Sequence, residues 1–283
     1  MSDVQVLRSV LYMPSSNERA LEKAKSLPAD AIIFDLEDAV APDAKELARE
    51  QACAAVRSGE YGNRTLTIRC NGVDTPWGHA DLRAIAAARP HAVVVPKVSG
   101  PGHLGLVESA VGADIRIWAM VETPAAIFSV REIAAHPQVD VLVMGTNDLA
   151  KELRAALVPG RAPLLPHLAV ALLAAREAGI EILDGVYNDV KDLEGFEAEA
   201  RQAAEMGFDG KTLVHPTQVE VANRVWAPTD DEVELARRVI EAFEQAEREG
   251  KGVVTVDGRM IENLHVENAR RTLATAEAIA ALG

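Results

Sequence analysis

The sequence has few of the patterns that mark disulfide-rich, metal-thiolate or membrane proteins. It holds two cysteines, Cys53 and Cys70, whose spacing fits neither a metal site nor a redox motif, so a disulfide framework is excluded. No apolar run reaches the roughly 18 residues needed to span a bilayer. The N-terminal segment MSDVQVLRSVLYMP lacks the apolar stretch of a signal peptide. We therefore expect a cytoplasmic protein that has no membrane partner.

Basic and aromatic residues are also scarce. Lysine and arginine total 29 against 43 aspartates and glutamates, which gives a formal net charge of -14. Because nucleic-acid phosphates require a basic surface, this charge argues against nucleic acid as a partner. An anionic small molecule can still bind in a local basic pocket. Aromatic residues make up only 4% of the chain, and the alanine, valine and leucine that replace them suit helices packed against a parallel sheet.

The chain does contain a repeated alternation of short apolar runs and helical stretches. Most runs are continuously apolar, as expected of strands buried on both faces. Their spacing is that of eight βα units, which predicts a (β/α)8 TIM barrel of the α/β class. An open doubly wound sheet is the alternative, but no GxGxxG follows the first run. The predicted strands are residues 9–14, 31–36, 64–71, 92–98, 116–122, 140–145, 181–187 and 211–216.

Turn and capping residues mark the ends of several predicted helices. Gly59, Gly179 and Gly207 follow helical runs, in the position of C-terminal stops. Ser15 and Glu18 have the spacing of a capping box at the start of the first helix.

The chain divides into a predicted catalytic barrel, residues 1–228, and a C-terminal extension, residues 229–283. The extension contains a charged amphipathic helix over 229–249, an exposed turn-like segment over 251–260 and a last helix over 261–282. A barrel does not need this extension. We therefore interpret it as packing or as a lid and oligomerisation segment.

Two apolar runs lead into a carboxylate at their carboxyl ends. Glu122 closes the run at 116–122, and Asp148 follows the run at 140–145. Because adjacent parallel strands end at the same mouth of a barrel, both carboxylates can converge on one Mg²⁺ ion, with waters as further ligands. Helix capping is the alternative for Asp148, since a helical stretch begins there. Glu122 lacks that alternative, because Thr123 is the natural cap.

Other charged residues follow neighbouring runs. Glu37 and Asp38 follow the second run and are interpreted as groups that bind metal-bound waters, with solvated loop acids as an equal alternative. Arg69 ends the third run, where a guanidinium can clamp an oxyanion or carboxylate or merely neutralise the acids. Lys97 ends the fourth run and has a similar interpretation. His215 is interpreted as a structural histidine.

Eight motifs occur in order across nearly the whole chain and together carry a family resemblance. They are RSVLYMPSSNERALEKA, DAIIFDLEDAV, TIRCNGVDTPW, VVVPKV, MVETPAAI, MGTNDL, GKTLVHPTQV and VDGRMIENLH. This set resembles the citrate lyase β-subunit-like CoA-ester lyases, which include malyl-CoA and citramalyl-CoA lyases and (3S)-malyl-CoA thioesterases. The resemblance implies a barrel that forms a trimer or hexamer, Mg²⁺ or Mn²⁺ on Glu122 and Asp148, and a CoA thioester and a small 2-oxo acid as ligands.

The resemblance also implies roles for individual residues. Arg69 would contact the substrate, and Glu262 of a neighbouring subunit would act as the catalytic acid or base beneath a C-terminal lid. Lys23, otherwise an ordinary surface lysine, would line the CoA ester site together with Tyr12. The predicted substrate-binding residues are Tyr12, Lys23, Arg69, Lys97, Glu122, Asp148 and Pro216.

The chain departs from the family pattern at two positions. Many lyases have aspartate at the position of Glu262, and malyl-CoA lyases tend to have arginine at the position of Asn17. The extra methylene of Glu262 moves its carboxylate by roughly 1.5 Å, and misplacement on the order of 1 Å can cost about 10²-fold in rate.

The leading functional hypothesis is reversible Mg²⁺-dependent cleavage of a 3-hydroxyacyl-CoA such as (3S)-malyl-CoA, methylmalyl-CoA or citramalyl-CoA into an acyl-CoA and a 2-oxo acid. Hydrolysis of (3S)-malyl-CoA to malate and CoA is the nearest alternative. It requires no proton exchange with a substrate carbon, so the departure at Glu262 is compatible with it. Lesser alternatives are a CoA-independent aldolase and a non-catalytic or carrier-dependent subunit of a citrate-lyase-like complex. The acyl group and the choice between trimer and hexamer stay open.

Overall fold

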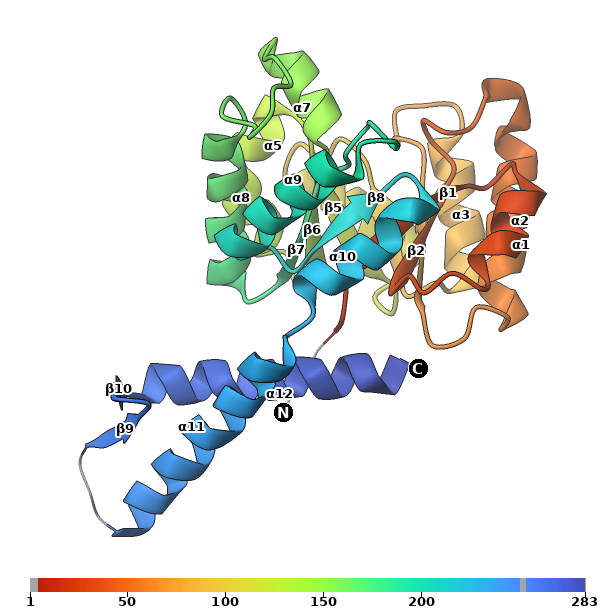
Figure 1. Ribbon diagram of the computed structural model, residues 1–283. Coiled ribbons are helices and arrows are strands. Elements are labelled where there is room, and N and C mark those ends of the chain that lie inside the picture. The colour runs from red at the N-terminus through yellow and green to blue at the C-terminus, as the bar shows by residue number, and fades with distance from the viewer. Residues whose placement is uncertain (1–4, 250–252, 283) are drawn as a thin grey trace. The chain divides into compact units, whose positions relative to one another are not determined.

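The computed structural model describes residues 5–249 and 253–282 (Figure 1). These residues form two compact units. One spans residues 7–225, and the other contains the C-terminal part of the chain from residue 226 onward. Among the described helices, none has the length and apolar character required to cross a membrane.

The first unit is a closed barrel of eight parallel strands in which each strand pairs with the next and β8 pairs with β1. All eight apolar runs form the predicted strands, and the predicted (β/α)8 barrel is confirmed. The strands are β1 (Ser9–Pro14), β2 (Ala31–Asp35), β3 (Thr65–Arg69), β4 (Ala92–Val95), β5 (Arg116–Val121), β6 (Val139–Met144), β7 (Glu181–Asp184) and β8 (Gly210–Leu213).

Helices surround the strands (Figure 1). They are α1 (Glu18–Ala24), the 3-10 turn η1 (Pro42–Ala44), α2 (Lys45–Ser58), α3 (Gly78–Ala88), α4 (Pro101–Val111), α5 (Pro124–Phe128), α6 (Val130–Ala134), α7 (Thr146–Leu153), α8 (Leu165–Ala178), α9 (Leu193–Met206), η2 (Pro216–Gln218) and α10 (Val219–Trp226). Gly59, Gly179 and Gly207 end α2, α8 and α9 with φ of 72°, 71° and 105°, a conformation that favours glycine.

The predicted capping box at the start of α1 is wrong. Asn17 is the N-cap, and its side chain accepts a hydrogen bond from the backbone N–H of Ala20 at 3.1 Å. Ser15 is instead fully buried directly after β1. A serine two residues before the cap cannot reach the first orphan N–H groups of the helix.

Both faces of the strands are buried, which explains why the runs are apolar without alternation. One set of side chains fills the barrel interior, and the intervening residues, such as Ile32 and Val93, are also fully buried. The interior cluster consists of Leu7, Val10, Ala31, Ile33, Ala92, Val94, Trp118, Met120, Val141, Val143 and Leu183, with Tyr12 packed against it.

The C-terminal unit contains α11 (Asp230–Glu249), the antiparallel hairpin of β9 (Val254–Val256) and β10 (Arg259–Ile261), and α12 (Asn263–Leu282). The two helices enclose a small core that includes Val239 and Val266. The expectation of a turn-like segment over 251–260 is wrong for residues 254–256 and 259–260, which form strands, while 251 and 252 lie outside the described residues. Asp257 and Gly258, with φ of 50° and 77°, form the turn. An Asp-Gly pair that follows a run of β-branched residues, here 253–256, is a hairpin signal.

A buried ion-pair network connects β7 and β8. Asp184 and Lys211 are register partners on these strands, and neither is exposed. Lys211 Nζ lies 2.6 Å from Asp184 and 2.8 Å from Glu199, while Arg161 Nη1 lies 2.7 Å from Asp184. The charges are sequestered from water, so each depends on its partners.

We expect Lys211→Met to lower the free energy of unfolding by about 3 kcal/mol, because it leaves a buried carboxylate with fewer partners. Urea unfolding measures the change. Arg131→Met is the matched control, because it removes an exposed 2.6 Å pair with Glu177 that contributes less than about 1 kcal/mol. Equal losses from the two variants would contradict the prediction.

Candidate active site at the carboxyl ends of the strands

A cavity of about 310 Å³ opens at the carboxyl end of the barrel. Its described lining includes four carboxylates and one guanidinium, so the cavity carries an excess of negative charge. The lining residues are Tyr12, Asp35, Asp38, Ala39, Arg69, Met120, Glu122, Met144, Gly145, Thr146, Asn147, Asp148, Val186, Asn188, Thr212 and Val214. The barrel thus places Tyr12, Arg69, Glu122 and Asp148 around one cavity.

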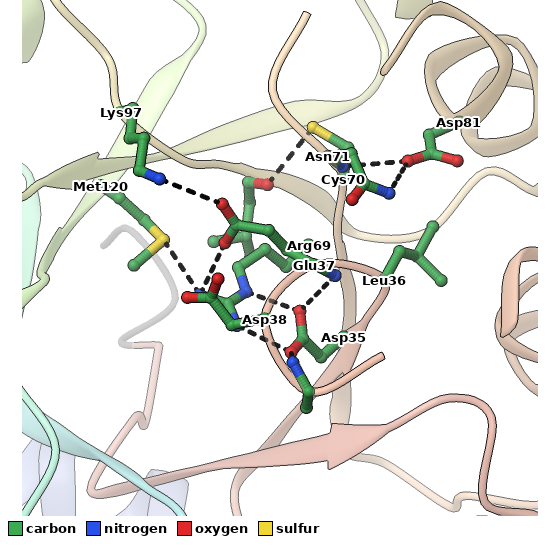
Figure 2. A network of polar contacts seen from close by, with 12 residues as sticks. Asp35, Leu36, Glu37, Asp38, Arg69, Cys70, Asn71, Asp81, Lys97 and Met120 are labelled. Carbon is green, nitrogen blue, oxygen red and sulfur yellow. Dashed lines mark hydrogen bonds and ion pairs between the residues drawn. The ribbon is translucent and has the colours of Figure 1, made fainter. Parts of the chain in front are cut away.

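Arg69, the last residue of β3, is buried and forms a two-pronged ion pair with Asp35, the last residue of β2. Nε lies 2.6 Å from Asp35 Oδ1, and Nη2 lies 2.7 Å from Oδ2. Nη1 lies 2.9 Å from Glu37 and 3.8 Å from Asp38 (Figure 2). The guanidinium also sits 4.8 Å from the ring centroid of Tyr12, in cation–π contact. Arg69 therefore neutralises acidic residues, which was one of the two interpretations of this residue. Its nearest acidic partners are Asp35 of β2 and Glu37 of the loop that follows β2.

Asp35 lines the cavity but is absent from the site residues predicted from the sequence. Burial raises its pKa, but Arg69 and the backbone N–H groups of Glu37 and Ala39 outweigh burial and hold the pKa below its ordinary value. The signal was available, because Asp35 ends an apolar run in the same way as Glu122. Asp35 thus stays ionised and fixes the guanidinium at the cavity.

Glu122 follows β5 and is almost fully buried, at 2% exposed. Its Oε1 accepts a 2.7 Å hydrogen bond from the backbone N–H of Lys97, whose φ of 50° is unusual for a lysine. Thr123 caps α5 as expected, because its side chain accepts from the N–H of Ala126 at 3.0 Å. Glu122 is therefore free of a capping role.

Burial raises the pKa of Glu122 to about 7, against the opposing effects of the Lys97 N–H and Arg69, and Asp148 adds to the rise. The carboxylate occupies space that is available only because residue 145 is glycine. A Cβ at Gly145 would lie 2.3 Å from Glu122 Oε2 and 2.4 Å from its Cβ. A buried carboxylate with a raised pKa, next to a second acid, gains stability from a nearby cation.

Asp148 lies in the first turn of α7 and is half-buried. Capping by Asp148 is wrong: the N-cap of α7 is Gly145, and no side chain makes a capping hydrogen bond there. Asp148 lines the same cavity as Glu122, and helix capping does not explain its presence there.

Two carboxylates beside an open cavity fit Mg²⁺, which retains several waters and uses one or two protein carboxylates. The described residues contain no group of three or more His, Cys, Asp or Glu that could enclose a metal ion. The site therefore suits a hard cation that keeps waters and substrate oxygens as ligands, and it does not suit a fully protein-bound zinc ion.

Glu37 and Lys97 lie beside the cavity. Glu37 Oε1 is 4.0 Å from Lys97 Nζ (Figure 2). Burial raises the pKa of Glu37 to about 7; Arg69 opposes the rise, and Asp38, Glu122 and Asp35 add to it. Asp38 and the Lys97 side chain are exposed. This loop therefore supplies one carboxyl group whose pKa lies near neutral pH.

The remaining predicted residues do not line the cavity. Lys23 is exposed on α1, and Pro216 begins η2 after the capping residue His215. Glu262 lies between β10 and α12 in the C-terminal unit, where it is exposed and its backbone N–H donates to His265 at 3.0 Å. Their predicted roles stay predictions. Asn147 and Asn188, which the sequence analysis did not single out, line the cavity and exchange hydrogen bonds of 3.1 and 2.8 Å.

Comparison with protein families identifies the chain. A family model described as HpcH/HpaI aldolase/citrate lyase matches residues 8–216, which include every strand of the barrel. The chain belongs to the HpcH/HpaI aldolase/citrate lyase family. A second model, described as a C–C bond lyase of the TIM-barrel fold, matches residues 164–280. The resemblance stated from the motifs is confirmed.

Individual HpcH/HpaI family members are similar over nearly the full length. A (3S)-malyl-CoA thioesterase of Cereibacter sphaeroides is 55% identical over 274 residues, covering 97% of this chain and 96% of the relative. Citrate lyase subunit beta of Escherichia coli strain K12 is 35% identical over 281 residues, with coverage of 95% and 93%. The crystal structure of CitE from Mycobacterium tuberculosis with magnesium, acetoacetate and coenzyme A has a TM-score of 0.79 at 28% identity, covering 95% of this chain and 97% of that one.

We expect Gly145→Ala to displace the Glu122 carboxylate, because the added methyl group would overlap it. Overpacking of this kind costs about 1–3 kcal/mol in the free energy of unfolding, and the displacement should weaken Mg²⁺ binding at least tenfold. Urea unfolding and calorimetric Mg²⁺ titration measure the two effects. Gly105→Ala is the matched control, because a Cβ there meets nothing within 4 Å. Unchanged Mg²⁺ affinity in Gly145→Ala would contradict the inference that the space at Gly145 positions the Glu122 carboxylate for the cation.

Proposed function

We propose that the protein hydrolyses (3S)-malyl-CoA to malate and CoA. The observation that carries this proposal is the 55% identity, over 97% of the chain, to a protein named (3S)-malyl-CoA thioesterase. The acidic cavity supports it. Four lining carboxylates face one guanidinium, so an anionic thioester substrate would be repelled unless a cation joined it to the acids.

Glu122 and Asp148 would hold that cation, Mg²⁺ or Mn²⁺. When bound, the metal supplies Lewis-acid stabilisation for oxygens that gain negative charge. The Lys97 N–H and the space at Gly145 orient the Glu122 carboxylate toward the cavity. The magnesium in the related CitE structures supports this assignment.

Arg69 would stabilise the negative charge that develops on the thioester oxygen. Its Nε and Nη2 are held by Asp35, and its Nη1 lies near Glu37 and 4.0 Å from the sulfur of Met120. A guanidinium fixed in this way needs little reorganisation when the charge appears. Tyr12, whose ring contacts Arg69, would form one wall of the acyl pocket.

Glu37 would accept a proton from the attacking water. Water oxygen bonds to the thioester carbon, the carbon–sulfur bond breaks, and the CoA thiolate leaves and takes up a proton. The overall reaction consumes one water and yields one carboxylate, one proton and one thiol. The pKa of Glu37 near 7 suits a general base at neutral pH.

The C-terminal unit would close the site of a neighbouring subunit in a trimer or hexamer and bring Glu262 to it. Lys23 would line the CoA ester site, and Pro216 would contact the substrate. Each of these assignments rests on the resemblance to family members.

Carbon–carbon cleavage to an acyl-CoA and a 2-oxo acid is the second candidate. The match of residues 164–280 to a C–C bond lyase model and the 35% identity to a citrate lyase β subunit favour it. This reaction would use Glu262 to protonate the carbon of the enolate. Hydrolysis makes no such demand, and the longer glutamate at this position is therefore compatible with it.

We expect (3S)-malyl-CoA incubated with the protein and Mg²⁺ to give malate and free CoA in equal amounts. Liquid chromatography coupled to mass spectrometry measures malate, glyoxylate, acetyl-CoA and CoA together. Glu122→Gln should reduce the rate by at least 10²-fold, because one charged metal ligand is lost. Stoichiometric glyoxylate and acetyl-CoA, without malate, would establish the lyase instead.

We expect kcat at saturating Mg²⁺, where the bound cation keeps Glu122 ionised, to fall about tenfold per pH unit below pH 7 and to be constant above it. The raised pKa of Glu37 means that the carboxyl group is protonated, and inactive as a base, on the acid side of about 7. Steady-state rates between pH 5.5 and 8.5 test this. Glu37→Gln should lower the plateau and remove the slope. A slope that survives in Glu37→Gln would assign the titration to another group.

A further inference from the structure

The segment between β2 and α2 places Asp38 in the lining of the cavity and Glu37 against Arg69 beside it, and it is hydrogen-bonded on two sides. On one side, Asp35 accepts hydrogen bonds from the backbone N–H groups of Glu37 at 2.9 Å and Ala39 at 3.0 Å. On the other, the backbone carbonyls of Leu36 and Glu37 accept hydrogen bonds from the ammonium group of Lys45, at 2.8 and 2.7 Å. The backbone position of Glu37 therefore depends directly on Lys45.

Lys45 is an unusual lysine, because it is 6% exposed and makes no ion pair within 4.0 Å among the pairs of the described residues. Its third ammonium hydrogen is directed to Asn71 Oδ1 at 2.7 Å, so all three donors have acceptors. Nζ also lies 5.2 Å from the centroid of Trp77. Burial lowers the pKa of Lys45, although Asp35, Glu37 and Asp81 oppose that change. Burial of a charge is costly unless the charge is hydrogen-bonded. The contacts of Lys45 offset this cost, and two of them fix the backbone of one loop.

Asn71 is held in turn. Its side-chain and backbone N–H groups both donate to Asp81 Oδ2, at 2.6 and 2.9 Å (Figure 2), and Arg49 Nε lies 2.7 Å from Asp81 Oδ1. Asp81 is fully buried in α3. The acceptor that orients Lys45 is therefore anchored to a helix outside the barrel strands, and the network extends from α3 to the loop beside the cavity.

We propose that Lys45 is a positioning residue for the reaction: it holds the backbone of Leu36 and Glu37 so that the Glu37 carboxylate meets Arg69 at the cavity. The described lining of the cavity does not include Lys45. The inference rests on the proposed function only for the role of Glu37 and the choice of substrate. Misplacement of a reacting group by about 1 Å is sufficient to cost on the order of 10²-fold in rate.

Lys45→Met tests this inference. We expect kcat for (3S)-malyl-CoA to fall about 10- to 100-fold, with KM within about threefold of the wild-type value. In the Glu37→Gln background the same substitution should lower kcat by less than about twofold, because the group that it positions is already absent. Asn71→Ala removes one of the three acceptors of the Lys45 ammonium group and replaces Lys45→Met if that variant does not fold. It should give a smaller loss of kcat, and this loss should also disappear in the Glu37→Gln background.

Asp30→Asn is the matched control. It weakens a buried pair with Arg8, 2.7 Å apart, just before β1 and β2 at the opposite end of the barrel. It should lower Tm to a similar extent and leave kcat within about twofold. Full additivity of Lys45→Met and Glu37→Gln, or equal losses of kcat in Lys45→Met and Asp30→Asn at equal Tm, would overturn the inference. Absence of thioester hydrolysis by the wild-type protein would instead refute the proposed function. The effect of Lys45→Met on kcat, in the wild-type and Glu37→Gln backgrounds, would then be measured for the lyase reaction.

Discussion

The ion pair between Asp35 and Arg69 is the interaction on which the rest of the site depends. The two residues are register partners at the carboxyl ends of β2 and β3, and both are buried. Withdrawal of two charges from water is costly and is offset only by good geometry and further hydrogen bonds. Here the contact is two-pronged, the backbone N–H groups of Glu37 and Ala39 satisfy Asp35, and Glu37 together with the Tyr12 ring satisfies Arg69.

The same ion pair organises the site beyond the two residues. Asp35 shapes the turn that carries Glu37, while Lys45 holds the other side of that turn. One aspartate thus connects the guanidinium at the cavity with the loop that supplies a titratable carboxylate. This arrangement makes the loop an extension of the rigid barrel, and catalytic groups on rigid elements are held more accurately than groups on independent loops.

The negative charge of the cavity and the backbone around Glu122 favour a bound cation. Glu122 is fixed by a backbone N–H from a lysine in the left-handed region and by the missing side chain at Gly145. Neither feature depends on the chemistry of the substrate. The proposed metal and oxyanion site would suit both hydrolysis and carbon–carbon cleavage. The two reactions would differ in whether a substrate carbon or a water molecule exchanges a proton with the protein.

The sequence alone determined the strands, the barrel and the positions of Glu122 and Asp148 at its mouth. It could do so because continuous apolar runs report burial on both faces, and parallel closure brings all carboxyl ends together. It could not show that Asp35 is the partner of Arg69, that Lys45 holds Glu37, or that Gly145 makes space for Glu122. Only the tertiary structure decided these contacts, because they depend on strand register and side-chain volume between residues distant in the chain, whereas sequence periodicity reports only on near neighbours.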